Sequence, residues 1–80
     1  MYMSIFRRLQ GIITSIANIR RKNLTINTYI QDDLGLNEDE LAELVLAIEE
    51  EFDIDLPKNI FKEFNTIGEI IGFIEAEMGR

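Results

Sequence analysis

The chain of 80 residues contains no cysteine and no histidine. Without cysteine it can form neither disulfides nor thiolate metal sites. Without histidine it has no zinc site of the usual kind and no Ser–His or Cys–His pair for nucleophilic catalysis. Catalysis would then need paired carboxylates in a cleft, and so short a chain offers little cleft. We therefore expect a protein that is not an enzyme and has no catalytic residues.

Long hydrophobic runs are also missing. Residues 9–19 are interrupted by four polar side chains, so they do not resemble a secretion signal, and no run approaches the ~18 apolar residues of a membrane span. Hydrophobic residues make up 46% and charged residues 29% of the chain, which is a globular balance. We expect a cytoplasmic protein consisting of one domain, residues 1–80.

Negatively charged side chains are absent from the first part of the chain. Residues 1–31 hold five basic side chains and no acidic one, whereas residues 32–80 hold fifteen acids and three bases. Residues 32–55 alone contain eleven acids and no base. Such asymmetry indicates either internal complementarity or two different outside contacts. The acidic part should repel nucleic acid and attract basic protein surfaces.

Hydrophobic residues recur at helical spacing along most of the chain, and no useful stretch alternates as a strand would. A first helix is expected over about residues 4–19. A second begins at Asn37, which forms a capping-box pattern with Glu40, and its apolar face continues to Phe52. A short third helix is expected near residues 60–64, and a fourth follows Thr66 and ends near Gly79.

Residues 23–35 are predicted to form a long loop between the first two helices, because threonine and asparagine favour turns. Five apolar residues of this loop are expected to lie across the core: Leu24, Ile26, Tyr29, Ile30 and Leu34. The first helix should pack on the second and fourth, which need its apolar face to close the core. A membrane-surface role for this basic helix is the less favoured alternative. The fold class is all-α, a four-helix bundle with a short third helix.

Three stretches of the chain have a distinctive pattern: residues 30–35 are I-Q-D-D-L-G, residues 43–52 are E-L-V-L-A-I-E-E-E-F, and residues 53–57 are D-I-D-L-P. They resemble, in this order, F-x-(E/D)-D-L-G, E-L-V-M-A-L-E-E-E-F and D-I-E-I-P of the acyl carrier protein family. The register holds without gaps over nearly the whole chain. The resemblance implies an acyl-carrier-protein-like bundle and a connection to lipid metabolism. It also implies a second helix that docks on basic patches of partner enzymes.

The chain departs from this family where the family serine carries phosphopantetheine. The family reads D-S-L there, but this chain reads Asn37-Glu38-Asp39, so Glu38 takes the serine position. Attachment needs a hydroxyl, and the resemblance therefore implies that phosphopantetheine and other cofactors are absent. Glu38 could mimic the negative phosphate, but a favourable first-turn residue is the simpler interpretation.

The predicted partner-binding surface is the outer face of the second helix. Its residues are Glu38, Asp39, Glu43, Leu46, Glu49 and Glu50. They combine acids with one apolar side chain, a mixture typical of electrostatically steered contacts. The leading prediction is a non-catalytic interaction or adaptor domain, a monomer whose partner is a protein with a basic patch. The alternative is an unconventional or regulatory carrier-family protein in fatty-acid, polyketide or related biosynthesis.

Two further expectations concern metals and the interior. Asp32-Asp33 and residues 37–40 fail the template of a calcium loop, so no metal site is predicted. Phe61 stands where the family often has alanine. Its ring is expected to fill the space between the second and third helices in which family members shelter an acyl chain. The less favoured alternative is that Phe61 points to solvent.

Overall fold

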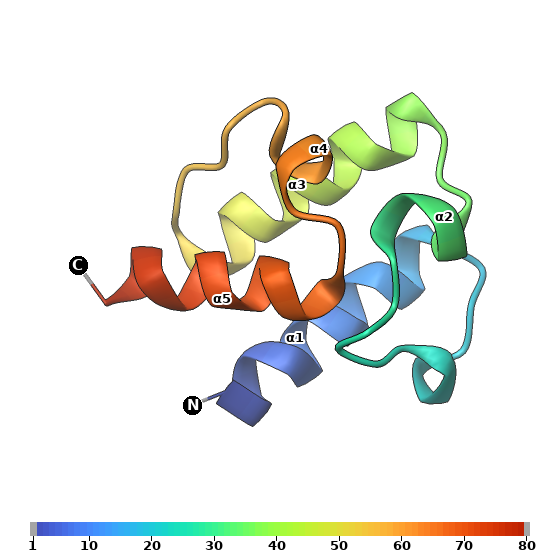
Figure 1. The fold of residues 1–80 in the computed structure, drawn as a ribbon, viewed down its shortest axis with the longest axis horizontal. Coiled ribbons are helices and arrows are strands. Elements are labelled where there is room, and N and C mark those ends of the chain that lie inside the picture. Colours follow the sequence, from blue (N-terminus) through green and yellow to red (C-terminus); the bar gives the residue numbers. More distant parts are fainter. Residues whose placement is uncertain (1, 80) are drawn as a thin grey trace.

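The computed structural model describes residues 2–79, which form five α-helices and one short 3-10 helix, with no strand among them (Figure 1). The elements are α1 (Tyr2–Ile16), η1 (Arg21–Asn23), α2 (Ile30–Leu34), α3 (Glu38–Phe52), α4 (Ile60–Glu63) and α5 (Ile67–Met78). This arrangement confirms the predicted all-α fold. The four predicted helices are α1, α3, α4 and α5, and α2 is an additional short helix.

The two best predicted helices begin at capping boxes. The side-chain oxygen of Asn37 accepts the backbone N–H of Glu40 at 2.8 Å, and the Glu40 carboxylate accepts that of Asn37 at 3.0 Å. Thr66 and Glu69 make the same reciprocal bonds at the start of α5. Each box satisfies backbone donors that the helix itself leaves without partners. The sequence signals therefore fixed both starting points.

The segment predicted as one long loop contains η1 and α2, and α1 ends at Ile16, three residues earlier than expected. After Ile16, the backbone N–H of Ile19 bonds to the carbonyl of Ala17, so the helical pattern is broken. The α2 helix has only five residues. The Asp33 carboxylate accepts the N–H of Tyr29 at 2.8 Å, and Gly35 ends the helix with a φ of 63° that favours glycine.

The core lies where α1 packs against α3 and α5, as predicted (Figure 1). Its most enclosed side chains come from all five α-helices and include Leu9, Ile13, Ile30, Leu44, Ile48, Ile60, Ile67, Ile70, Ile71 and Ile74. Leu24 and Ile30 are buried, so the connection between α1 and α3 does cross the core. Ile26 and Tyr29 are 42% and 47% exposed, however, and the prediction was wrong for these two.

The connection is fastened to the start of α5. The backbone N–H groups of Ile67 and Gly68 donate to the carbonyls of Thr28 and Ile26, at 3.0 and 2.8 Å. Gly68 permits this approach, because a Cβ there would lie 3.0 Å from the Ile26 carbonyl oxygen. These bonds fasten the residues just before α2 to the start of α5.

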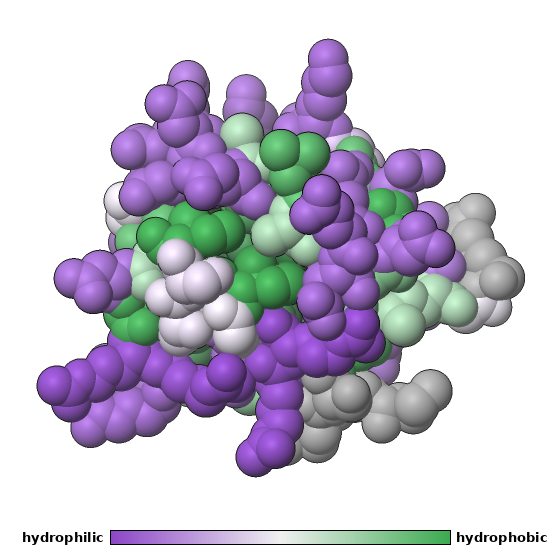
Figure 2. Space-filling view, turned by 180° about the vertical axis from the view of Figure 1, so that it is seen from behind, coloured by the Kyte–Doolittle hydropathy of each residue, from purple (hydrophilic) through white to green (hydrophobic). Residues whose placement is uncertain are grey.

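Hydrophobic side chains also reach the surface. Seen from behind, they gather in the middle of one face and are framed by hydrophilic side chains (Figure 2). Several side chains at the edge of the core are only partly buried, including Ile12, Ile16 and Leu41. Within residues 2–79, no helix has both the length and the apolar character that a membrane crossing requires.

Candidate docking face and groove on α3

Helical spacing separates α3 into a buried stripe and an exposed stripe. The buried stripe is Leu44, Ile48 and Phe52. The opposite stripe is Asp39, Glu43, Leu46 and Glu50, and all four of these side chains are exposed. We call these four residues the docking face. Leu46 is 60% exposed, the most exposed of the large hydrophobic side chains described.

The acids of the docking face are not used within the described part of the chain. Asp39, Glu43 and Glu50 form no side-chain hydrogen bond or ion pair with other residues in 2–79. The one ion pair in that range joins Arg8 to Glu51, on the side of α3 that faces α1. The charges of the docking face are therefore available to an outside partner.

The other two predicted site residues lie apart from this stripe. Glu49 is half-buried, and its carboxylate accepts the backbone N–H of Leu56 at 2.8 Å. Its carbonyl accepts the N–H of Asp53, which ends α3 with a φ of 55°. Glu49 thus holds the chain that leaves α3. Glu38 is exposed and lies at the edge of α3 that faces α4.

A groove of about 280 Å³ opens between α3 and α4. It is lined by Gln31, Glu38, Leu41, Ala42, Val45, Lys58, Asn59, Phe61 and Lys62. Phe61 is 6% exposed, so its ring packs inward and the solvent-facing alternative is wrong. The ring was also expected to fill the space between α3 and α4 completely. This is wrong at the surface, because apolar side chains of α3 and Phe61 line an open groove there.

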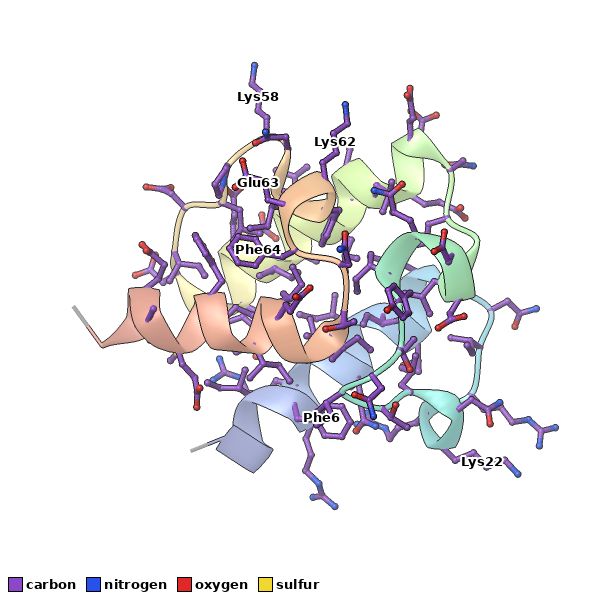
Figure 3. All side chains as sticks on the ribbon, viewed as in Figure 1. Phe6, Lys22, Lys58, Lys62, Glu63 and Phe64 are labelled. Atoms are coloured by element: carbon purple, nitrogen blue, oxygen red, sulfur yellow. The ribbon has the colours of Figure 1, made fainter. Side chains whose placement is uncertain are left out.

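Two lysines at this groove were missed in the sequence. Lys58 and Lys62 are exposed and extend away from the bundle beside α4 (Figure 3). They line the same groove as Glu38, and they are the only cations described between residues 32 and 79. Their isolation within an acidic segment was the available signal. The groove thus has a mixed rim, whereas the docking face carries negative charge only.

No three acidic side chains within residues 2–79 come together in a group that could hold a metal ion. The acids of α3 instead point along different sides of the helix, toward solvent, toward α4 and toward Arg8.

Comparison with known proteins identifies the family. Residues 7–74 match the family model described as the phosphopantetheine attachment site. The chain belongs to the acyl carrier protein family. It is 31% identical over 75 residues to an acyl carrier protein of Trieres chinensis, with 94% of each chain covered. It is 29% identical over 72 residues to that of Clostridium acetobutylicum, covering 90% of this chain and 94% of the relative.

A third relative is the mitochondrial acyl carrier protein of Saccharomyces cerevisiae. It is 40% identical over 59 residues, which are 74% of this chain and 47% of the relative. The family resemblance that the stretches around α2 and α3 indicated is therefore confirmed.

The prediction that no cofactor belongs to this protein is wrong by this comparison. The matching family model is described as a phosphopantetheine attachment site, and the relatives are acyl carrier proteins. Both findings point to phosphopantetheine as the prosthetic group. The prediction rested on one aligned position, that of Glu38, whereas the family match covers residues 7–74.

The start of α3 offers no hydroxyl side chain to which this group could be attached. A phosphoester bond to a protein side chain needs a hydroxyl oxygen, as the modified serine of the family supplies. The N-cap and first turn of α3 present the Asn37 amide and three carboxylates, those of Glu38, Asp39 and Glu40. These side chains do not fit the attachment chemistry at this position. That Glu38 occupies the family serine position stays a prediction.

Proposed function

We propose that this acyl-carrier-type protein is a non-catalytic interaction module whose docking face binds a basic patch on a partner protein. The observation that carries the proposal is Leu46, an exposed apolar side chain on the same stripe as three acids that have no partner within residues 2–79. Apolar contact in the centre and charge around it is the arrangement in which association is steered electrostatically and then held by desolvation.

The energetics of α3 favour such a contact. No bond within the described chain has to break when the docking face meets a cation, because its acids make none. The helix is fixed at its start by the capping box and along its length by three buried side chains, so little ordering is needed on binding. Lysine and arginine on the partner would be attracted from a distance, since the whole protein has a net charge of -7.

Glu38 and Glu49 have different parts in this proposal. Glu38, at the groove between α3 and α4, extends the negative surface toward Lys58 and Lys62 and would meet the edge of the partner. Glu49 acts through the fold, because its carboxylate holds the Leu56 N–H. Substituting Glu49 should therefore affect stability together with binding, and it is a poor probe of docking alone.

The test is quantitative recovery of partners from the protein's own cell. The tagged protein is compared with the Leu46→Ala and Glu43→Lys variants, and with Glu75→Lys on α5 as the control with the same change of charge. Proteins that Leu46→Ala and Glu43→Lys lose, while Glu75→Lys retains them, support the docking face. Equal losses in Glu43→Lys and Glu75→Lys would show that net charge alone matters and would contradict the proposal.

A second candidate is a carrier-family protein that serves or regulates fatty-acid, polyketide or related biosynthesis. The groove between α3 and α4 favours it, because Leu41, Val45 and Phe61 give an apolar lining beside the docking face. Partners recovered through the docking face would then be enzymes of such pathways. Adding a medium-chain fatty acid should shift the amide resonances of residues 41–45 and 60–62. Absence of both effects favours the adaptor function.

A further inference from the structure

A second hollow lies in the basic part of the molecule, between α1 and η1. It is lined by Arg7, Arg8, Gln10, Arg21 and Lys22, and none of its lining residues is acidic. Lys22 extends outward from η1 (Figure 3), and the same lower side of the molecule carries strongly hydrophilic side chains in the view from behind (Figure 2). The docking face and the groove on α3 share no residue with this hollow.

The guanidinium of Arg21 is held in place by the protein itself. Its Nη1 donates to the carbonyl of Arg7 at 3.0 Å and to the Gln10 side-chain oxygen at 3.3 Å. Gln10 is only 8% exposed, and its Nε2 donates to the carbonyls of Arg21 and Leu24. The Arg21 backbone and side chain are thus both tied to Gln10, so the guanidinium has a fixed position on the edge of the hollow.

The remaining donors of Arg21 are open. Nε and Nη2, which form the side edge of the guanidinium, make no hydrogen bond within residues 2–79. Gly11 provides the space, because a Cβ at this residue would lie 3.3 Å from Nη2. A guanidinium edge with two parallel N–H groups matches two oxygens of one oxyanion, and phosphate is bound by arginine in this way, as carboxylate is.

The other cations of the hollow add charge without intramolecular partners. Arg7 and Lys22 form no ion pair with described residues, whereas Arg8 pairs with Glu51 at 2.8 Å and lies over the Phe52 ring. Three cationic side chains around a hollow without a neutralising acid repel one another, and an anion with more than one negative charge would relieve that repulsion.

We propose that the hollow between α1 and η1 is a binding site for a phosphate group, with Arg21 as the bidentate ligand and Arg7 and Lys22 as charge partners. The phosphate belongs either to a soluble phosphate ester or to a lipid headgroup. The site is independent of the docking face on α3, and the protein therefore carries two contact regions of opposite sign.

The test is a titration of the full chain with inorganic pyrophosphate at constant ionic strength, followed by amide and arginine Nε resonances. We expect saturable shifts at Arg21 Nε and at the amides of residues 20–24. Arg21→Gln should weaken binding roughly tenfold or more, as expected when a charge-assisted bidentate contact is lost. Lys22→Gln should also weaken pyrophosphate binding. The Lys22 side chain makes no bond to described residues, so this change should leave the fold unaffected.

The matched control is Arg20→Gln, which removes the same charge next to Arg21 but outside the hollow. Its affinity for pyrophosphate should change by less than about twofold, because screening weakens the contribution of a more distant exposed charge. Equal loss in Arg20→Gln and Arg21→Gln, or shifts that do not saturate, would overturn the proposal, since only general attraction would remain.

A vesicle arm distinguishes the two sources of phosphate. Co-sedimentation is measured with phosphatidylcholine vesicles and with vesicles that also contain phosphatidylglycerol. Binding to the anionic vesicles that Arg21→Gln loses and Arg20→Gln keeps assigns the site to a lipid headgroup. Saturable pyrophosphate binding without vesicle binding assigns it to a soluble phosphate ester. Vesicle binding that both variants lose equally, without a saturable pyrophosphate site, counts against the proposal.

Discussion

The helices α1 and α3 have the same length, fifteen residues, and both pack in the core, but they use their polar side chains in opposite ways. Two polar side chains of α1 bond to distant parts of the chain: Arg8 pairs with Glu51, and Gln10 ties η1 to the helix. The acids of the docking face on α3, by contrast, make no such bonds in the described residues.

This difference separates charge that builds the fold from charge that is left for partners. Around α1, hydrogen bonds to backbone carbonyls fix the cations Arg8 and Arg21, so their substitution should be felt in stability or in a local site. On the docking face of α3, substitution should leave the fold intact and change mainly the association with a partner. Four predictions test this comparison, from the largest expected effect to the smallest.

Substitutions in the core should destabilise the protein to a similar extent on α1 and on α3, unlike substitutions on the surface. Ile13 on α1 and Ile48 on α3 are both fully buried. Ile13→Ala and Ile48→Ala should each lower the free energy of unfolding by about 2–5 kcal/mol, from lost transfer energy and the cavity left behind. Urea denaturation followed by circular dichroism measures both. A cost below about 1 kcal/mol for Ile13→Ala would mean that α1 is loosely attached, and the comparison would fail.

The capping boxes should have the next largest effect. Asn37→Ala at the start of α3 and Thr66→Ala at the start of α5 should each cost about 1 kcal/mol, because backbone N–H groups lose their acceptor. Asn37→Gly is the control and should cost only a few tenths of a kcal/mol. Thermal denaturation shows whether the two alanine variants are less stable than Asn37→Gly. An Asn37→Ala variant as stable as the parent would show that packing alone starts α3.

The Arg8 contacts should give a smaller and salt-dependent effect. Arg8 donates to the Glu51 carboxylate and carbonyl and lies 4.4 Å over the Phe52 ring centre, but the ion pair is partly exposed. Arg8→Ala should cost about 0.5–1 kcal/mol, less at high salt. Arg7→Ala, the neighbour with an equal charge and no side-chain bond in the described chain, should cost little. Equal effects would remove the distinction drawn for α1.

Substitutions on the docking face should have the smallest effect on stability, and Glu43→Gln should raise the stability. Glu43 lies one turn after Asp39, and like charges at this spacing destabilise a helix. Glu43→Gln should raise the free energy of unfolding by about 0.2–0.5 kcal/mol at low salt and by less in 1 M NaCl. Leu46→Ala should stay within about 0.5 kcal/mol of the parent. Substantial destabilisation by either change would show that this face serves the fold.

The starts of α3 and α5 could be read from the sequence because the signals are local. A side chain at the N-cap and another three residues later satisfy each other's backbone, whatever the rest of the chain does. The docking face could be predicted for a similar reason, since helical spacing alone puts Asp39, Glu43, Leu46 and Glu50 opposite the buried stripe. The role of Glu49 could not be predicted from spacing, because its bond to Leu56 depends on how the chain turns after α3.

The sequence by itself determined the all-α class, the caps and the acidic face of α3, since these follow from spacing and composition. It also indicated the family, through the resemblance of residues 30–35 and 43–57. Only the tertiary structure decided that residues 30–34 form α2, that an open groove lies beside Phe61, and that Arg21 is held against Gln10. Each of these depends on contacts between residues far apart in the chain or on a helix too short to form alone. Their energies come from packing and from backbone groups that the fold brings together, which local spacing does not encode.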